Sequence, residues 1–223
     1  MKIAIIGTGK VGRALGGSIT RAGHDVTLAG LDDAKARRVA SELGASAGRT
    51  PAQAAADADV VILAVPFTAL QDVATALGDQ AAGKVVIDAT NPLKPDYSGL
   101  ATDGGPSAAE QLATLLPGAH IAKAFNTLFG SLQAEPDALR TTVDALFATD
   151  GEEARKTVTE LIDSIGLRPV DAGPLEAARQ MESLAWLNMR IQMRYGGDWR
   201  STFVLLGAPV GSTPAPRREL VHA

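Results

Sequence analysis

Three closely spaced glycines near the start of the chain could bind the phosphates of a nucleotide. Residues 7–12 have the pattern G-x-G-x-x-G, which follows an apolar run at residues 3–6 and leads into a helix-compatible stretch. The first glycine of such a pattern permits a tight turn, the second lets a pyrophosphate approach the backbone, and the third lets helix and strand pack closely. Free N–H groups at the helix N-terminus then face the phosphates. The stretch predicts a dinucleotide site, unless it is only a glycine-rich packing turn, and its contact residues would be Gly7, Thr8, Gly9, Lys10, Val11 and Gly12.

The end of the second predicted strand, residues 25–29, is where such sites distinguish NAD from NADP. An acidic side chain there binds the ribose hydroxyls of NAD, whereas an arginine accommodates the 2′-phosphate of NADP. The sequence has Leu31 and Asp32 at this place. Asp32 either binds ribose or N-caps the following helix, and Lys35 either contacts a phosphate or belongs to the solvated face of that helix. The residues therefore leave the choice between NADP and NAD open.

Other candidates stand where further predicted strands end. Residues 59–65 are a largely β-branched run without polar alternation, as expected of a strand buried on both faces of a parallel sheet, and residues 84–88 are predicted to form the next strand. Ligands bind beyond the carboxyl ends of such strands. The candidates for the nicotinamide and its ribose are Ala64, Val65, Pro66 and Asn91, the last of which also fits a plain Asn-Pro turn. A further strand at residues 119–124 adds Asn126 and Thr127 as candidates for contact with a second substrate.

Strands and helices alternate from residue 1 to about residue 172. This order predicts an α/β fold with a doubly wound, mostly parallel Rossmann sheet. Residues 173–223 are predicted to form a small C-terminal helical extension that completes the substrate pocket, with a frayed tail from about residue 211. The methionines and tryptophans of this extension form either an apolar wall beside a flat ring or ordinary core and dimer packing. We expect Met189 and Arg190 to contact the second substrate, although Arg190 could simply be solvated.

The composition excludes several classes of function. The chain has 223 residues, 46% of them hydrophobic, and a formal net charge of −4, which suits one substantial core and argues against nucleic-acid binding. It has no cysteine and only three scattered histidines, so we expect no metal site. No apolar run approaches the ~18 residues of a membrane span, and the first strand begins at once. We therefore expect no signal peptide, no membrane association and a cytoplasmic location. We also expect a homodimer, because little sequence is left to cover the apolar C-terminal helix.

Taken together, these motifs resemble the family of coenzyme F-420-dependent NADP oxidoreductases, the NADPH:deazaflavin reductases. The resemblance covers the chain to about residue 207, and its most specific part is residues 166–175 followed by Met-Glu-Ser-Leu at 181–184. Other matching stretches are residues 7–12, 64–67 and 91–93. The stretch Lys-Ala-Phe-Asn-Thr at 123–127 resembles a bacterial branch and the reductase domain of membrane ferric reductases more than the archaeal enzymes, which have a histidine in place of Asn126. The Ser-Arg pair with which the family grips the 2′-phosphate falls on Gly30 and Leu31.

The resemblance implies direct hydride transfer between NADP(H), with NAD as the other cofactor in question, and coenzyme F-420 or a related flavin-like small molecule. Such a transfer needs no acid, base or nucleophile from the protein, because the cofactors carry the chemistry. We therefore expect no catalytic side chain. The protein would hold the reacting carbons ~3–3.5 Å apart and exclude water, with Asn126, Thr127 and the C-terminal helix around the second ring. The alternatives are an NAD(P)H-dependent reductase of free flavin, quinone or imine, and a non-catalytic dinucleotide sensor.

Overall fold

A single sheet organises the part of the chain that the computed structural model describes, residues 1–139 and 141–207. Its strands, in the order β3-β2-β1-β4-β5-β6-β7-β8, confirm the predicted α/β class. All neighbouring strands are parallel except β6 and β7, which are antiparallel. The strands are β1 (Lys2–Ile6), β2 (Asp25–Ala29), β3 (Ser46–Ala47), β4 (Val60–Leu63), β5 (Val85–Asp88), β6 (His120–Ala124), β7 (Asp144–Thr149) and β8 (Arg168–Asp171). The strand order reverses between β1 and β4, and doubly wound sheets bind ligands at such a reversal.

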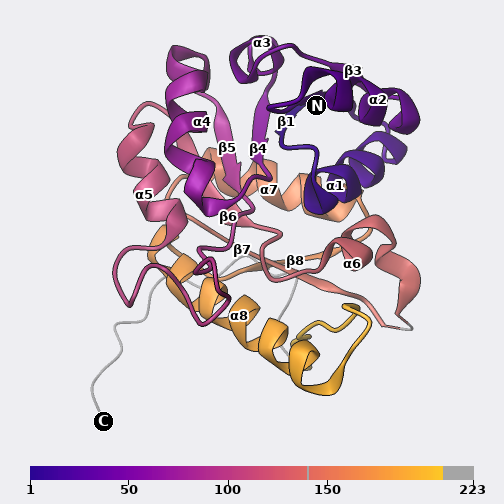
Figure 1. Cartoon of the computed structure of the whole chain (residues 1–223), viewed down its shortest axis with the longest axis vertical. Helices are drawn as coiled ribbons and strands as arrows, with labels where there is room; N and C mark the ends of the chain where they lie inside the picture. Colours follow the sequence, from indigo (N-terminus) through magenta and orange to yellow (C-terminus); the bar gives the residue numbers. More distant parts are fainter. Residues whose placement is uncertain (140, 208–223) are drawn as a thin grey trace.

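Helices cover both faces of this sheet (Figure 1). One face packs against α1 (Lys10–Arg21), α2 (Asp33–Leu43) and α7 (Glu152–Ser164), and the other against α3 (Pro51–Ala55), α4 (Leu70–Leu77) and α5 (Ala108–Leu115). Two further helices are α6 (Gly130–Ala134) and α8 (Ala178–Tyr195), and single 3₁₀ turns occupy Phe67–Ala69, Gly78–Ala81, Pro136–Ala138 and Leu175–Ala177. Alternate residues of β1 enter different cores: Ile3 and Ile5 pack on one face, and Ala4 and Ile6 on the other. This double burial explains why the strands lack polar alternation.

Side-chain caps fix where several of these helices begin. Thr50 accepts a hydrogen bond from the backbone N–H of Gln53, and Pro51 occupies the first helical position of α3. Ser107 and Glu110 form a capping box at the start of α5. Such reciprocal bonds satisfy N–H groups that have no partner within the helix. Thr50 and Ser107 thus fix the starts of α3 and α5 by short-range contacts.

Two features of the sheet were not expected from the sequence. The strand β3 is only two residues long, and both are exposed, so no apolar run marks it. The strand β7 runs against β6 because the segment between them carries α6, which packs on α1 at the same edge of the sheet. Within the predicted C-terminal helical extension, the helix α8 begins at Ala178, after the 3₁₀ turn Leu175–Ala177. The division at residue 172 stays a prediction, and the frayed tail from about residue 211 lies outside the described residues.

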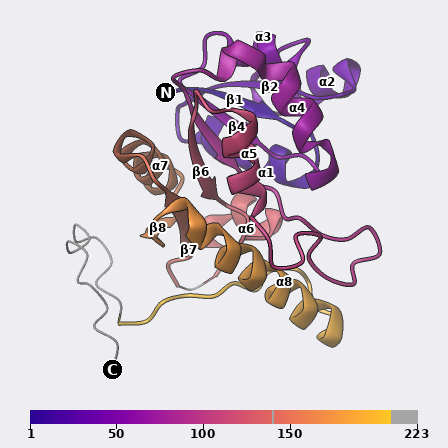
Figure 2. The same ribbon diagram turned by 90° about the vertical axis from the view of Figure 1, so that its left-hand side faces the viewer.

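The helix α8, orange in Figure 1, lies across the carboxyl end of the sheet rather than on either face. Figure 2 shows the long loop between β5 and α5 beside it. In the described residues, no helix combines the length and the apolar character that crossing a membrane requires. The position of α8 matters for function, because it encloses the edge where the candidate site lies.

Candidate functional site

The glycine-rich loop has room for a pyrophosphate at one position and none at the other two. Gly7 has a φ of +121°, and a Cβ there would lie 2.2 Å from the carbonyl oxygen of Ala64. A Cβ at Gly12 would lie 1.9 Å from the carbonyl oxygen of Gly7. A Cβ at Gly9, in contrast, would meet no atom within 4 Å. Gly7 and Gly12 are therefore required for packing, and Gly9 leaves the backbone open to a ligand.

The N-terminus of α1 is ready to bind an anion. No side chain caps this helix, and its first turn contains no acidic residue. The first N–H groups of a helix have no partner within it and carry the positive end of its dipole. Together with the open backbone at Gly9, this arrangement fits the pyrophosphate of a dinucleotide.

A cleft of about 770 Å³ extends from this helix to the C-terminal segment. Its walls come from α1, from the residues after β5 and β6, from α6, and from α8 with the turn that follows it. The lining residues are Lys10, Val11, Arg13, Ala14, Gly17, Arg21, Leu43, Ala89, Asn91, Phe125, Asn126, Leu128, Phe129, Gly130, Ser131, Ala134, Met189, Asp198 and Trp199. The apolar side chains on its far wall would shield a bound ring from water.

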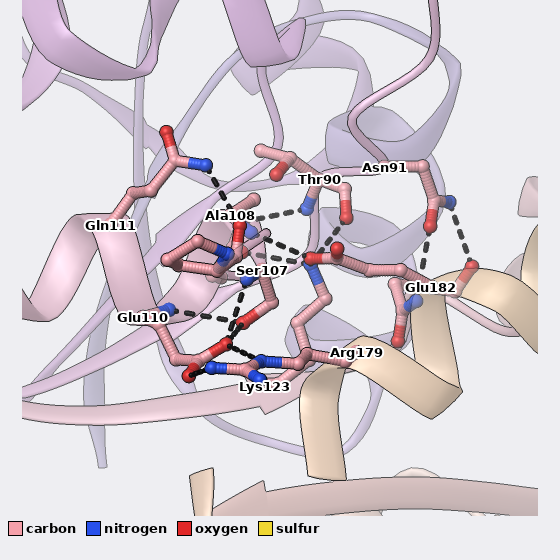
Figure 3. Close-up of polar contacts among 12 residues, drawn as sticks. Thr90, Asn91, Ser107, Ala108, Glu110, Gln111, Lys123, Arg179 and Glu182 are labelled. Carbon is pink, nitrogen blue, oxygen red and sulfur yellow. Dashed lines mark hydrogen bonds and ion pairs between the residues drawn. The ribbon is translucent and has the colours of Figure 1, made fainter. Parts of the chain in front are cut away.

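Two asparagines join the ends of β5 and β6 at this cleft. Asn126 Nδ2 donates to Asn91 Oδ1 at 3.0 Å, and Asn91 Nδ2 donates to the carbonyl oxygen of Asn126 at 2.9 Å. Figure 3 shows the Asn91 side chain making these bonds beside α8. In the described part of the chain, three buried side-chain oxygens here have no hydrogen-bond partner, on Thr90, Asn126 and Thr127. Polar atoms without a partner therefore gather at the ends of β5 and β6, beside the cleft.

A buried ion network supports this edge from beneath, and its centre is Lys123. The Lys123 ammonium donates to Asp88 Oδ2 at 2.8 Å, to the carbonyl oxygen of Thr90 at 2.6 Å and to Glu182 Oε1 at 2.8 Å. Figure 3 shows Thr90 and Glu182 converging on this group. The three charged side chains are at most 1% exposed. The network therefore ties β5, β6 and α8 to one another directly behind Asn91.

The electrostatics of this network are asymmetric, since one cation faces two carboxylates. Burial raises the pKa of Glu182, and the nearby Lys123 charge and hydrogen bond oppose that rise. Glu182 Oε1 also accepts from the backbone N–H of Ala108 at 2.9 Å. At the protein surface nearby, the Arg179 guanidinium lowers the pKa of Glu110 from 4.5 to about 2. Arg179 and Glu182 thus attach α8 to α5 by one surface contact and one buried contact.

The end of β2 lies against the glycine-rich loop but carries no arginine. A Cβ at Gly30 would lie 3.2 Å from Thr8 Oγ1, so the two segments touch. The Asp32 carboxylate accepts from the backbone N–H of Lys35 at 2.9 Å, which confirms that Asp32 N-caps α2. Leu31 is fully exposed, and the structure pairs Lys35 with no acidic side chain among the described residues. Lys35 is thus the cation on the first turn of α2 that is available for a phosphate.

The structure gathers only some of the sequence-predicted site residues at the cleft. Five of them line it together: Lys10, Val11, Asn91, Asn126 and Met189. Ala64 and Val65 lie against Gly7, and Pro66, beyond them, is exposed. Thr127 is buried next to Asn126 and does not line the cleft, and Arg190 is exposed on α8 outside it. Leu31, Asp32 and Lys35 stand at the end of β2, on the far side of the glycine-rich loop.

Sequence reasoning missed several residues at this site. Lys123 sits inside an apolar strand, and Asp88 pairs with it in register on the neighbouring strand, so two opposite charges in buried strands were the available signal. Glu182 had no signal of its own beyond its place in the Met-Glu-Ser-Leu stretch of the resemblance. The aromatic pair of Phe129 and Trp199, with ring centroids 5.2 Å apart, joins residues 70 positions apart and could not be seen in the sequence.

Comparisons with known proteins identify the family to which the chain is similar. Residues 2–92 match the family model described as "NADP oxidoreductase coenzyme F420-dependent". The chain is 36% identical over 212 residues to the "F420-dependent NADP reductase" of Methanothermobacter thermautotrophicus, covering 87% of this chain and 90% of the relative. It is 31% identical to rat "Metalloreductase STEAP3", covering 82% of this chain and 36% of that protein.

A solved structure from Arthrobacter sp. FB24, described as that of a candidate F420-dependent NADP reductase, superposes with a TM-score of 0.84. The two are 27% identical, and the match covers 92% of this chain and 100% of the other. The archaeal relative and this structure are each matched over nine tenths or more of their own length. The chain therefore belongs to the family of coenzyme F-420-dependent NADP reductases and is an oxidoreductase.

Proposed function

We propose that this protein transfers a hydride directly between NADP(H) and coenzyme F-420 or a related flavin-like ring. Family membership supports the reaction class, since the archaeal relatives are named for these two molecules. The observation that carries the proposal is the cleft, which runs without interruption from Lys10 and Val11 beside the glycine-rich loop to Met189 and Trp199. A module that only sensed a dinucleotide would need the first half of this cleft alone.

The residues divide the binding task between the two ends of the cleft. The backbone at Gly9 and the N-terminus of α1 would hold the pyrophosphate, because both are open to an anion. We assign the 2′-phosphate to the neighbourhood of Thr8 and Lys35 at the end of β2. Asn91 would contact the nicotinamide side, and Asn126 with Met189 and its aromatic neighbours would contact the second ring. When bound, NADPH supplies the hydride.

No side chain is assigned a role as acid or base. Within the described residues, the ionisable groups that line the cleft are Lys10, Arg13, Arg21 and Asp198. Arg13 pairs with Glu42, and Arg21 donates to Ser18 and to the carbonyl oxygen of Ala134. The carboxylates of Asp88 and Glu182 are fully buried and engaged by Lys123. The chain's own contribution is therefore to bind, to align two rings and to exclude water.

A stoichiometric assay tests this function. We expect the protein to oxidise one NADPH for each coenzyme F-420 reduced, and to use NADPH in preference to NADH. Flavin mononucleotide in place of coenzyme F-420 shows whether the acceptor site takes any flavin-like ring. Oxidation of neither NADPH nor NADH with either acceptor would refute the proposal and favour a dinucleotide sensor.

A homodimer and a cytoplasmic location stay proposals. The helix α8 carries three exposed apolar side chains, Leu187, Ile191 and Met193, which are 37–49% exposed, and we propose that a second copy covers Leu187 and Ile191, which lie one turn apart. Light scattering should give twice the 23.0 kDa mass of the chain. A mass near 23.0 kDa would contradict the dimer while leaving the reaction untouched.

A further inference from the structure

Trp199 adopts a backbone conformation that an aromatic residue rarely takes. Its φ is +59°, in the left-handed region, where bulky residues are outliers. It follows α8 in the turn at residues 197–201, and its ring meets that of Phe129 edge to face at 5.2 Å and 90°. Phe129 and Trp199 line the same cleft as Asn126. The indole is nevertheless 44% exposed, so it is not simply a core residue.

Hydrogen bonds from two separate elements hold this turn in place. Gln192 Oε1 accepts from the backbone N–H of Trp199 at 2.8 Å, and the Ser131 hydroxyl donates to the carbonyl oxygen of Trp199. Gln192 Nε2 donates to Ser201 Oγ at 2.6 Å, and Asn188 Nδ2 donates to the carbonyl oxygen of Ser201 at 3.0 Å. An unusual backbone conformation persists only where its surroundings determine it in this way.

The supporting residues are themselves placed for this task. Asn188 and Gln192 lie four residues apart, on one face of α8, and they are only 2% and 9% exposed. A Cβ at Gly197 would lie 2.1 Å from Gln192 Oε1, so a larger residue there would displace the Gln192 side chain that holds the turn. The same face of α8 carries Glu182, which the Lys123 network holds against the sheet. The position of Trp199 is thus fixed relative to the ends of β5 and β6, whose residues line the same cleft.

We propose that Trp199 determines acceptor specificity by packing its indole against the flat ring of the second substrate. The inference rests on the proposed function and extends it, because it selects acceptors that are planar and conjugated. Flat rings bind aromatic side chains through stacked or edge-to-face contact, worth about tenfold in affinity beyond the area buried. The other tryptophan, Trp186, is on α8 outside the cleft and serves as the matched control.

Single-tryptophan variants separate the two indoles. Trp186→Phe leaves Trp199 as the only tryptophan, and we expect its emission to be quenched in proportion to occupancy when coenzyme F-420 or flavin mononucleotide is titrated in the presence of NADP. Trp199→Phe leaves Trp186, whose emission should change little. Free N-acetyltryptophanamide at the same absorbance corrects for light absorbed by the ligand. Quenching that is equal in both variants, or absent with both rings, would overturn the proposal.

Kinetics supply a second readout that misfolding would not imitate. Trp199→Leu should raise the KM for coenzyme F-420 about tenfold and leave the Kd of NADPH unchanged, while Trp199→Phe should recover most of the loss. An unchanged KM in the leucine variant would overturn the inference while the function stands. If the wild-type protein fails to turn over coenzyme F-420, the proposed function fails instead, and the fluorescence titrations still decide whether Trp199 contacts a ring.

Discussion

Alanine at Gly9 should abolish tight cofactor binding without disturbing the fold. Gly9 has φ −76° and ψ −168°, an extended conformation that any L-residue adopts, and an added Cβ would meet nothing within 4 Å. Alanine restricts the unfolded chain more than glycine does, which stabilises the folded protein by about 0.4–1 kcal/mol. Alanine is also a poorer N-cap residue than glycine, which destabilises the helix by a similar amount, so the two effects nearly cancel. The melting temperature without cofactor should therefore stay within about 2 °C of the wild-type value.

The expected loss of affinity follows from the contacts that the methyl group would block. The added Cβ would occupy the space through which the pyrophosphate reaches the backbone. Losing one hydrogen bond to a charged group costs about 1.5–3 kcal/mol, so the Kd of NADPH should rise roughly 10- to 150-fold. Calorimetric titration of the folded variant with NADPH measures this directly.

Alanine at Gly12 is the matched control, because it changes the same atom in the same loop. Its Cβ would lie 1.9 Å from the carbonyl oxygen of Gly7, and relieving such a clash costs about 1–3 kcal/mol or more. The melting temperature should fall by about 2–12 °C. The reasoning is refuted if Gly9→Ala binds NADPH as tightly as the wild-type protein, or if it unfolds as readily as Gly12→Ala.

Three further substitutions test other parts of the account. Lys123→Met leaves two buried carboxylates without their cation, so it should lower the free energy of unfolding by about 3–5 kcal/mol and the melting temperature by about 6–20 °C. A smaller fall in melting temperature than in a surface lysine variant would show that the network is not needed for stability. Leu31→Arg should tighten NADPH binding by about tenfold relative to NADH binding, because an arginine there can pair with the 2′-phosphate. Lys35→Ala should weaken the binding of NADPH and leave that of NADH unchanged. If either substitution changes the two affinities equally, the 2′-phosphate binds elsewhere. Arg179 holds the pKa of Glu110 at about 2, below its usual 4.5. The ion pair therefore stabilises the folded protein fully above pH 4.5, and this stabilisation is lost as the pH falls toward 2. The difference in melting temperature between the wild-type protein and Glu110→Gln should shrink over that interval, and a constant difference would contradict the pairing.

The sequence allowed the sheet and its glycine-rich loop to be predicted because both depend on local signals. An apolar strand, three spaced glycines and a helix occupy adjacent residues, and the caps at Asp32, Thr50 and Ser107 each act within three or four positions. Strand direction is not local in this sense. The antiparallel direction of β7 depends on where the segment between β6 and β7 packs, and no residue within β7 indicates it.

The second half of the site depends on contacts between distant residues. Lys123 and Glu182 are 59 positions apart, and Ser131 and Trp199 are 68 apart. Each partner alone resembles an ordinary charged or aromatic residue, so the sequence could indicate an apolar wall on the C-terminal helix but not which side chains form it. Arg190 illustrates the limit, since it lies next to Met189 in sequence and yet faces away from the cleft that Met189 lines.

The central claim is that a hydride passes directly between two bound rings, with no side chain taking part as acid or base. NADPH that carries deuterium at one of the two positions on its nicotinamide C4, in ordinary water, tests it most directly when the reduced coenzyme F-420 is analysed by mass spectrometry. We predict that one of the two labelled isomers transfers its deuterium to a ring carbon of the reduced coenzyme F-420. When unlabelled NADPH reacts in heavy water, no deuterium from the solvent should appear at that carbon. Loss of the deuterium to water from both isomers would contradict direct transfer.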